Sequence, residues 1–110
     1  MKNLFMIEID PRDESMNKVS LESGKVGLES LYSSLECSMV ERIAMNGDLD
    51  LWIDEEGRLN QAQGRIGTFS IDGQEFVGKG LICGVSDDGE SIGIDEDFAD
   101  FIIDNLQLNF

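Results

Sequence analysis

The chain has 110 residues, and its 23 acidic residues outnumber its eight basic residues to give a formal net charge of -15 at pH 7. The length predicts one domain spanning residues 1–110, and 41% hydrophobic residues are enough to form a core in spite of the charge. The chain contains no histidine, which excludes Ser-His and Cys-His nucleophile pairs, so we expect neither an enzyme nor a cofactor.

The first third of the chain predicts two strands and a helix. Residues 4–9 and 16–21 have strand-like apolar patterns, and the polar segment 11–15 between them has the composition of a turn. Further on, apolar residues recur at i, i+3, i+4 and i+7, which is typical of one face of a helix. These residues are Leu28, Leu31, Tyr32 and Leu35.

A β-hairpin is predicted next. Strands at 39–45 and 49–53 are joined by Asn46-Gly47, the strongest short-range hairpin signal. Because side chains alternate along a strand, Leu49, Leu51 and Ile53 share one face. The other face carries Asp48, Asp50, Trp52 and Asp54. Trp52 is either an exposed interface anchor or is covered by a helix, and the sequence leaves both arrangements open.

The last half predicts an exposed loop at 60–66, a strand pair at 67–71 and 76–85 around Asp72-Gly73, and an acidic turn at 87–89. A final helix follows, with acids at 95–97 in its first turn, where the helix dipole favours negative charge. Its predicted apolar stripe is Phe98, Phe101, Ile102, Asn105 and Leu106. The C-terminal LQLNF segment predicts either a last strand or a dimer edge.

These elements predict an α+β fold, a mostly antiparallel sheet of about five or six strands with two helices. The glycines at 78, 80 and 84 form no Walker motif and predict bulges or close packing within a strand. Direct nucleic-acid binding is not expected, because it needs a cationic surface.

Three segments resemble a known family: 31–41 (LYSSLECSMVE), 52–59 (WIDEEGRL) and 76–84 (FVGKGLICG). Over roughly residues 28–84 the chain resembles the phage and mobile-element family of unknown function numbered 3846. Glu41 stands at the family's Glu position, and residues 54–59 stand at its acidic turn. Cys37-Ser38 and residues 61–65 depart from the family pattern. The resemblance implies a phage or mobile-element origin and no particular activity.

The apolar segments and the cysteines indicate in which cellular compartment the protein is found. Cys37 and Cys83 lie in apolar stretches without metal-ligand spacing and predict two reduced, buried thiols. Glu8 interrupts the apolar start of the chain, which therefore predicts a strand and not a signal peptide. No apolar run approaches the ~20 residues that span a membrane. We expect a cytoplasmic protein with no membrane partner, in the bacterial host cytoplasm if a phage encodes it.

The acidic residues form no recognisable metal or catalytic motif. Residues 46–50 begin like a calcium loop, but Leu51 and Gly57 occupy positions that need Gly and Glu. With 23 acids, some carboxylate pair always has the spacing of a glycoside hydrolase, so such a pair carries no information. We expect no catalytic residue and no metal site.

The negative charge is therefore the feature of the sequence that best indicates a function. Duplex DNA carries one charge per ~1.7 Å of axis, and residues 66–110 hold ten acidic residues against one basic residue, Lys79. We expect a non-enzymatic protein that binds and inhibits a cationic or nucleic-acid-binding host protein in an anti-defence role, with imitation of nucleic-acid charge as one means. The predicted partner-binding residues are Asp48, Asp50, Trp52, Asp54, Glu55, Glu56, Asp87, Asp88 and Glu90. The alternative is a domain that binds or sequesters a small ligand such as a nucleotide, and a homodimer is also left open.

Overall fold

The computed structural model describes residues 4–21, 28–35, 39–45, 48–56 and 67–110. The predicted Asn46-Gly47 turn, the predicted loop at 60–66 and Cys37 lie outside the described residues. The elements are β1 Leu4–Asp10, β2 Ser15–Leu21, α1 Leu28–Leu35, β3 Val40–Ala44, β4 Leu49–Asp54, β5 Thr68–Ile71, β6 Gln74–Val77, β7 Gly80–Val85, β8 Ser91–Ile92, α3 Glu96–Asn105 and β9 Leu108–Asn109. The α+β prediction is confirmed.

The main sheet is antiparallel and six-stranded, in the order β2-β1-β7-β4-β3, with β8 pairing to β7. Strand β7 lies between the β1–β2 and β3–β4 hairpins, and all its residues are buried except Val85, which is partly buried. This burial on both faces explains why its sequence, GLICGV, is apolar without alternation. A second sheet has the order β6-β5-β9, so the C-terminal segment forms a strand, one of the two predicted arrangements.

The single strand predicted at 76–85 is wrong, because this run supplies two strands in different sheets. Strand β6 ends at Val77 and β7 begins at Gly80. Between them Gly78 has φ 87°, a left-handed conformation that is readily adopted only by glycine. Its N–H donates to the carbonyl oxygen of Gly67 at 2.9 Å, which fixes the corner. The chain changes direction at Gly78-Lys79-Gly80, which the sequence pattern predicts to be part of a strand.

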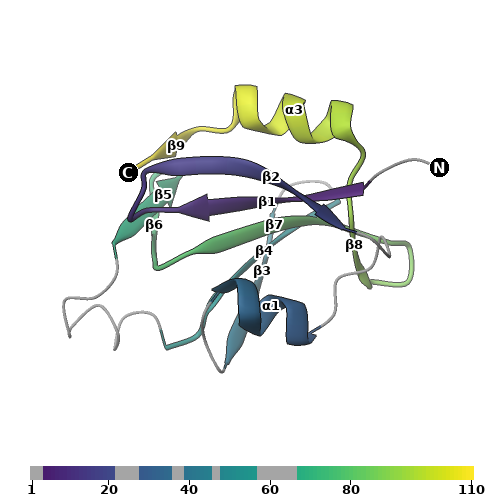
Figure 1. Cartoon of the computed structure of the whole chain (residues 1–110), viewed down its shortest axis with the longest axis horizontal. Helices are drawn as coiled ribbons and strands as arrows, with labels where there is room; N and C mark the ends of the chain where they lie inside the picture. Colours follow the sequence, from purple (N-terminus) through teal and green to yellow (C-terminus); the bar gives the residue numbers. More distant parts are fainter. Residues whose placement is uncertain (1–3, 22–27, 36–38, 46–47, 57–66) are drawn as a thin grey trace.

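The two helices cover opposite faces of the main sheet, which are called the α1 face and the α3 face below (Figure 1). On the α1 face, α1 packs over a small cluster. Its buried residues are Met6, Leu31, Leu35, Leu81 and Cys83. On the α3 face, α3 and the second sheet enclose the larger core. Its buried residues are Ile7, Ile9, Leu51, Ile53, Phe69, Ile71, Phe76, Ile82, Ile94, Ala99 and Ile102.

The predicted apolar stripe of the last helix is wrong in its aromatic residues. Helix α3 buries Ala99 and Ile102, whereas Phe98 and Phe101 are 40% and 61% exposed. The small Ala99 allows the helix backbone to approach β1 and β2, and Lys18 on β2 binds Glu96 and Asp100 of the helix at 2.9 and 2.8 Å. These contacts rotate the two phenylalanines outward. The predicted acidic first turn is confirmed, since Asp95 caps the helix by accepting from the Phe98 N–H at 2.8 Å.

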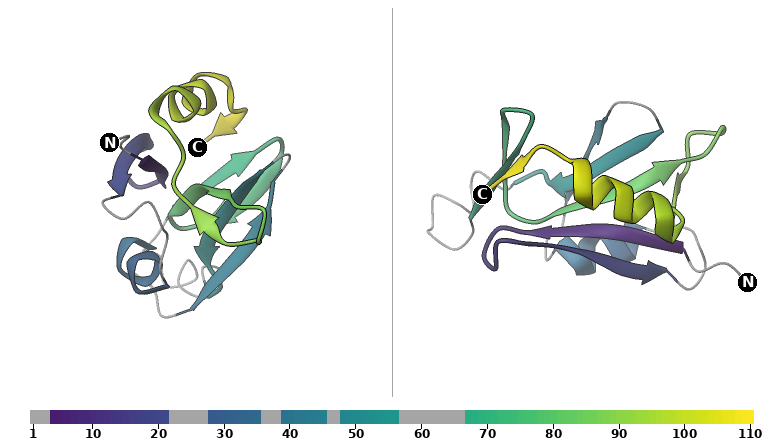
Figure 2. Two further views of the ribbon diagram at one scale, coloured as in Figure 1. Left: turned by 90° about the vertical axis from the view of Figure 1, so that its right-hand side faces the viewer. Right: turned by 90° about the horizontal axis from the view of Figure 1, so that it is seen from above.

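Helix α3 lies over the β1 and β2 side of the main sheet (Figure 2). Among the described residues, the α3 face of β3 and β4 is therefore covered mainly by the second sheet. Here Ile43, Met45 and Leu49 are only partly buried, although they pack against the core. In the part of the chain that the structure describes, no helix is both long and apolar enough to cross a membrane.

Candidate functional site

The acidic residues predicted at 48–56 do not form one patch, because strand β4 separates them. Asp48 precedes β4, and its carbonyl oxygen accepts from the Val85 N–H at 2.9 Å, so Asp48 lies near the exposed acids Asp87, Asp88 and Glu90. Glu55 and Glu56 follow the far end of β4. A six-residue strand at ~3.4 Å per residue separates the two groups by about 20 Å.

Asp50 is buried, which contradicts its prediction as a partner-binding residue. It is 1% exposed, and its Oδ2 lies 2.5 Å from Nε of Arg42. Among the described residues the same Oδ2 has no hydrogen-bond partner, so the ion pair with Arg42 is what compensates its charge. The register places Arg42 opposite Trp52, and Trp52 is on the same face of β4 as Asp50. The charges of Arg42 and Asp50 therefore both lie on the α1 face.

Asp54 is only 8% exposed, so little of its side chain is open to a partner. Its Oδ1 accepts from the backbone N–H of Glu56 at 2.8 Å. This bond closes the turn after β4 and holds Glu55 and Glu56 outward, where both are exposed. Asp54 therefore positions its neighbours.

Trp52 lies on the α1 face and packs against the cluster that α1 covers, but it is only partly buried, so the structure lies between the two predicted arrangements. Its Nε1–H donates to Oγ of Ser91 at 3.1 Å. Cys83 lies nearby as a buried, free thiol, as predicted. Burial raises the pKa of the Cys83 thiol, and hydrogen bonds with Ser91 and Trp52 offset part of this rise. These contacts make the polar groups of the α1 face structural.

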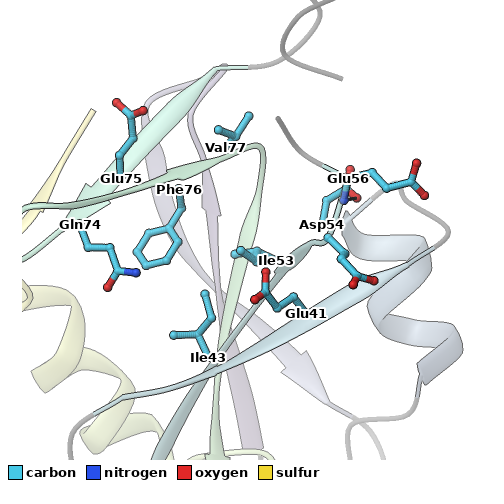
Figure 3. A pocket seen from close by; sticks show the side chains of 10 residues that line it. Glu41, Ile43, Ile53, Asp54, Glu56, Gln74, Glu75, Phe76 and Val77 are labelled. Carbon is cyan, nitrogen blue, oxygen red and sulfur yellow. Dashed lines mark hydrogen bonds between the residues drawn. The ribbon is translucent and has the colours of Figure 1, made fainter. Parts of the chain in front are cut away.

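A hollow of about 440 Å³ opens at the end of β4 where Glu55 and Glu56 lie (Figure 3). We call it the acidic hollow. It is lined by Glu41, Ile43, Ile53, Asp54, Glu55, Glu56, Gln74, Glu75, Phe76 and Val77. Its volume is within the range of ligand-binding pockets.

The hollow forms where β3 and β4 of the main sheet meet β6 of the second sheet, with side chains from all three strands pointing into the same space. The antiparallel register places Glu41 of β3 directly opposite Ile53 of β4, on the α3 face. Phe76 of β6 is buried against the same region. In Figure 3, Glu41, Ile43, Ile53 and Phe76 border one space. The floor is therefore apolar and the rim carries carboxylates.

The rim of the hollow is negatively charged. Glu41, Glu55, Glu56 and Glu75 are all exposed. None of the described residues that line the hollow is Lys or Arg. Four carboxylates over a low-dielectric floor strengthen one another's attraction for a cation. Among the described residues, no three Asp, Glu, Cys or His side chains are arranged to hold a metal ion.

Sequence reasoning did not name Glu41 or Glu75 as site residues. Glu41 carried a signal, because it stands at the Glu position of the family resemblance. Glu75 carried none, since it reaches the hollow only through the pairing of β5 with β6 and the fold of the second sheet over β4.

A comparison with family models places the chain in a family. The model of DUF3846, described as a domain of unknown function, matches residues 1–107. The chain belongs to this family. No curated protein and no solved structure matches the chain.

All three segments that resemble the DUF3846 family contribute to the acidic hollow. Glu41 comes from the first segment, residues 54–56 from the second, and Phe76 and Val77 from the third. Segments that are far apart in sequence thus meet at one place on the surface, which makes this hollow the best candidate site.

Proposed function

We propose that the protein acts without catalysis, by binding a basic segment of a partner protein at the acidic hollow. The observation that carries this proposal is the gathering of Glu41, Glu55, Glu56 and Glu75 around an apolar floor with no basic residue among the described lining residues. Carboxylates held at a concave apolar site attract Lys and Arg side chains and raise the rate of association with a cationic partner.

The lining favours a cationic protein over a nucleotide. The phosphates of a nucleotide would face four carboxylates without a compensating cation from the described lining. A Lys or Arg side chain places its charge at the rim while its aliphatic stem contacts apolar residues such as Phe76. The small-ligand alternative is therefore the weaker of the two proposals.

Inhibition of a host protein extends this proposal. The second acidic group, formed by Asp48, Asp87, Asp88 and Glu90, lies about 20 Å away along β4 and widens the negative surface. A partner whose nucleic-acid-binding surface is basic would meet both groups, and the bound protein would then exclude the nucleic acid. An anti-defence role in a phage or mobile element is the biological setting in which such exclusion is useful.

The test is capture of partner proteins from a bacterial lysate by two variants with the same change in charge. The hollow variant carries Glu41→Gln, Glu55→Gln, Glu56→Gln and Glu75→Gln. The control variant carries Asp48→Asn, Asp87→Asn, Asp88→Asn and Glu90→Gln. Exposed ion pairs contribute up to about 1 kcal/mol each, so the hollow variant should retain about tenfold less partner, and the control, which leaves the hollow intact, should lose clearly less of it.

Mass spectrometry of the retained proteins at low and high salt gives the measurement, and duplex DNA added to the captured complex tests competition. Equal losses in the two variants would mean that binding depends on net charge and not on the hollow. No protein retained by the unaltered chain at low salt would overturn the proposal.

A further inference from the structure

The acidic hollow continues into a second hollow of about 380 Å³, which we call the apolar hollow. The two share Ile43, Gln74 and Phe76 in their linings, so they adjoin along β3 and β6. The remaining residues of the apolar hollow are Ala44, Met45, Leu49, Leu51, Ile71, Asp72 and Leu106. The joined space is a groove whose lining changes from four glutamates at one end to aliphatic side chains at the other.

The groove follows β3, an edge strand of the main sheet. Alternate residues along this segment line it, in the order Glu41, Ile43, Met45. Alternate side chains of an extended chain are ~6.8 Å apart, so these three positions span about 14 Å. An extended peptide lying in the groove presents its own alternate side chains at the same spacing.

The charge of the lining determines which side chains fit each position. A Lys or Arg side chain is attracted to the Glu41 end, where Glu55 and Glu56 also lie. Apolar side chains suit the Met45 end, where Leu49 and Leu106 are partly buried and a ligand would remove their remaining surface from water. A second copy of this chain is a poor occupant, because its net charge of -15 opposes entry.

We infer that the groove binds an extended segment of the partner in which one basic and two apolar side chains occupy alternate positions. This inference rests on the proposed function, because it specifies the segment that the acidic hollow receives. It predicts the pattern basic-x-apolar-x-apolar, in either chain direction.

The test uses two acetylated and amidated peptides of identical composition. In the in-phase peptide, Lys-Ser-Leu-Ser-Leu, the basic and apolar side chains lie on one side of an extended chain. In the out-of-phase peptide, Lys-Leu-Ser-Leu-Ser, the leucines lie on the side opposite the lysine. NMR titration of the whole ¹⁵N-labelled protein should give about tenfold tighter binding of the in-phase peptide, because both leucines are then partly buried.

Substitutions at the two ends of the groove complete the test. Met45→Ser should remove most of the difference in affinity between the in-phase and out-of-phase peptides. Met45→Gln, which keeps the side-chain length, should have the same effect and serves as the second variant if Met45→Ser does not fold. Glu55→Gln with Glu56→Gln should weaken both peptides equally. The wild-type spectrum should be retained in each variant.

The possible outcomes separate the two proposals. Equal binding of the two peptides, or an in-phase advantage that both Met45 variants retain, overturns the inference. If in that case binding still depends on Glu55 and Glu56, the proposed function stands alone. Binding that does not depend on these glutamates, or no spectral change at millimolar peptide, counts against both.

Discussion

The two faces of the main sheet bury different kinds of side chain. The α3 face encloses aliphatic and aromatic side chains, including Phe69 against Phe76 with ring centroids 5.4 Å apart. The α1 face buries one carboxylate, Asp50, which pairs with the exposed Arg42 and lies on the same face as the hydrogen-bonded Trp52. From this difference we expect the free energy of unfolding to depend on side-chain volume on the α3 face and on charge balance on the α1 face.

The largest effect is expected from breaking the charged pair on the α1 face. Arg42→Ala leaves the buried Asp50 carboxylate without its cation and should lower the free energy of unfolding by about 2–3 kcal/mol. Adding Asp50→Asn removes the charge and should recover much of this loss. Urea denaturation of the single and double variants measures both effects.

The exposed pairs of Lys18 provide the control for this experiment. Lys18→Ala removes ion pairs to Glu96 and Asp100, which are exposed, and should lower stability much less than Arg42→Ala does. An Arg42→Ala variant no less stable than Lys18→Ala would mean that burial of Asp50 does not depend on Arg42, and the contrast between the two faces would lose its charge component.

A smaller effect is expected from adding volume on the α3 face. A Cβ at Gly80 would lie 2.7 Å from Cζ of Phe69, which is 1% exposed and has no room to move. Gly80→Ala should therefore cost about 1–2 kcal/mol through overpacking. Measured in a Phe69→Leu background, the same substitution should cost less, and an unchanged cost would show that the contact with Phe69 is not its cause.

The smallest effect is expected from titration of Cys83 on the α1 face. Burial raises the pKa of this thiol above its ordinary value of 9.0, so the folded state retains a proton that the unfolded state releases. The resulting stability is fully present below pH 9 and is lost as pH rises through the folded-state pKa. Cys83→Ala should lose less stability than the unaltered chain as the pH rises above 9 in urea denaturation. Parallel decreases in the two proteins would exclude the thiol as the cause.

Local patterns in the sequence were sufficient to predict most of the secondary structure. Alternation correctly placed Leu49, Leu51 and Ile53 on a core-facing side of β4, and helical spacing located α1 and α3. The errors arose where the tertiary arrangement decided the outcome. The rotation of α3 depends on Ala99 and on ion pairs from β2, and neither contributes to an apolar periodicity.

The candidate site was only partly predictable for a related reason. Glu55 and Glu56 were correctly placed in an exposed turn by composition. Their true neighbours, Glu41 and Glu75, come from other strands, and the pairing of β3 with β4 and the packing of β6 bring them together. Asp48 and Glu55, which are only seven positions apart in the sequence, lie at opposite ends of β4. Charge clusters in sequence therefore do not indicate which charges share a surface.

The central position of β7 has a consequence for the order in which the chain can fold. The β1–β2 and β3–β4 hairpins are local, but they share no ladder with each other, and each pairs with Gly80–Val85. During synthesis both hairpins emerge long before this segment, and until it arrives each presents an unpaired edge. The excess of carboxylates would keep such half-built chains apart by mutual repulsion. On this view the negative charge limits self-association while the central strand β7 is still being made.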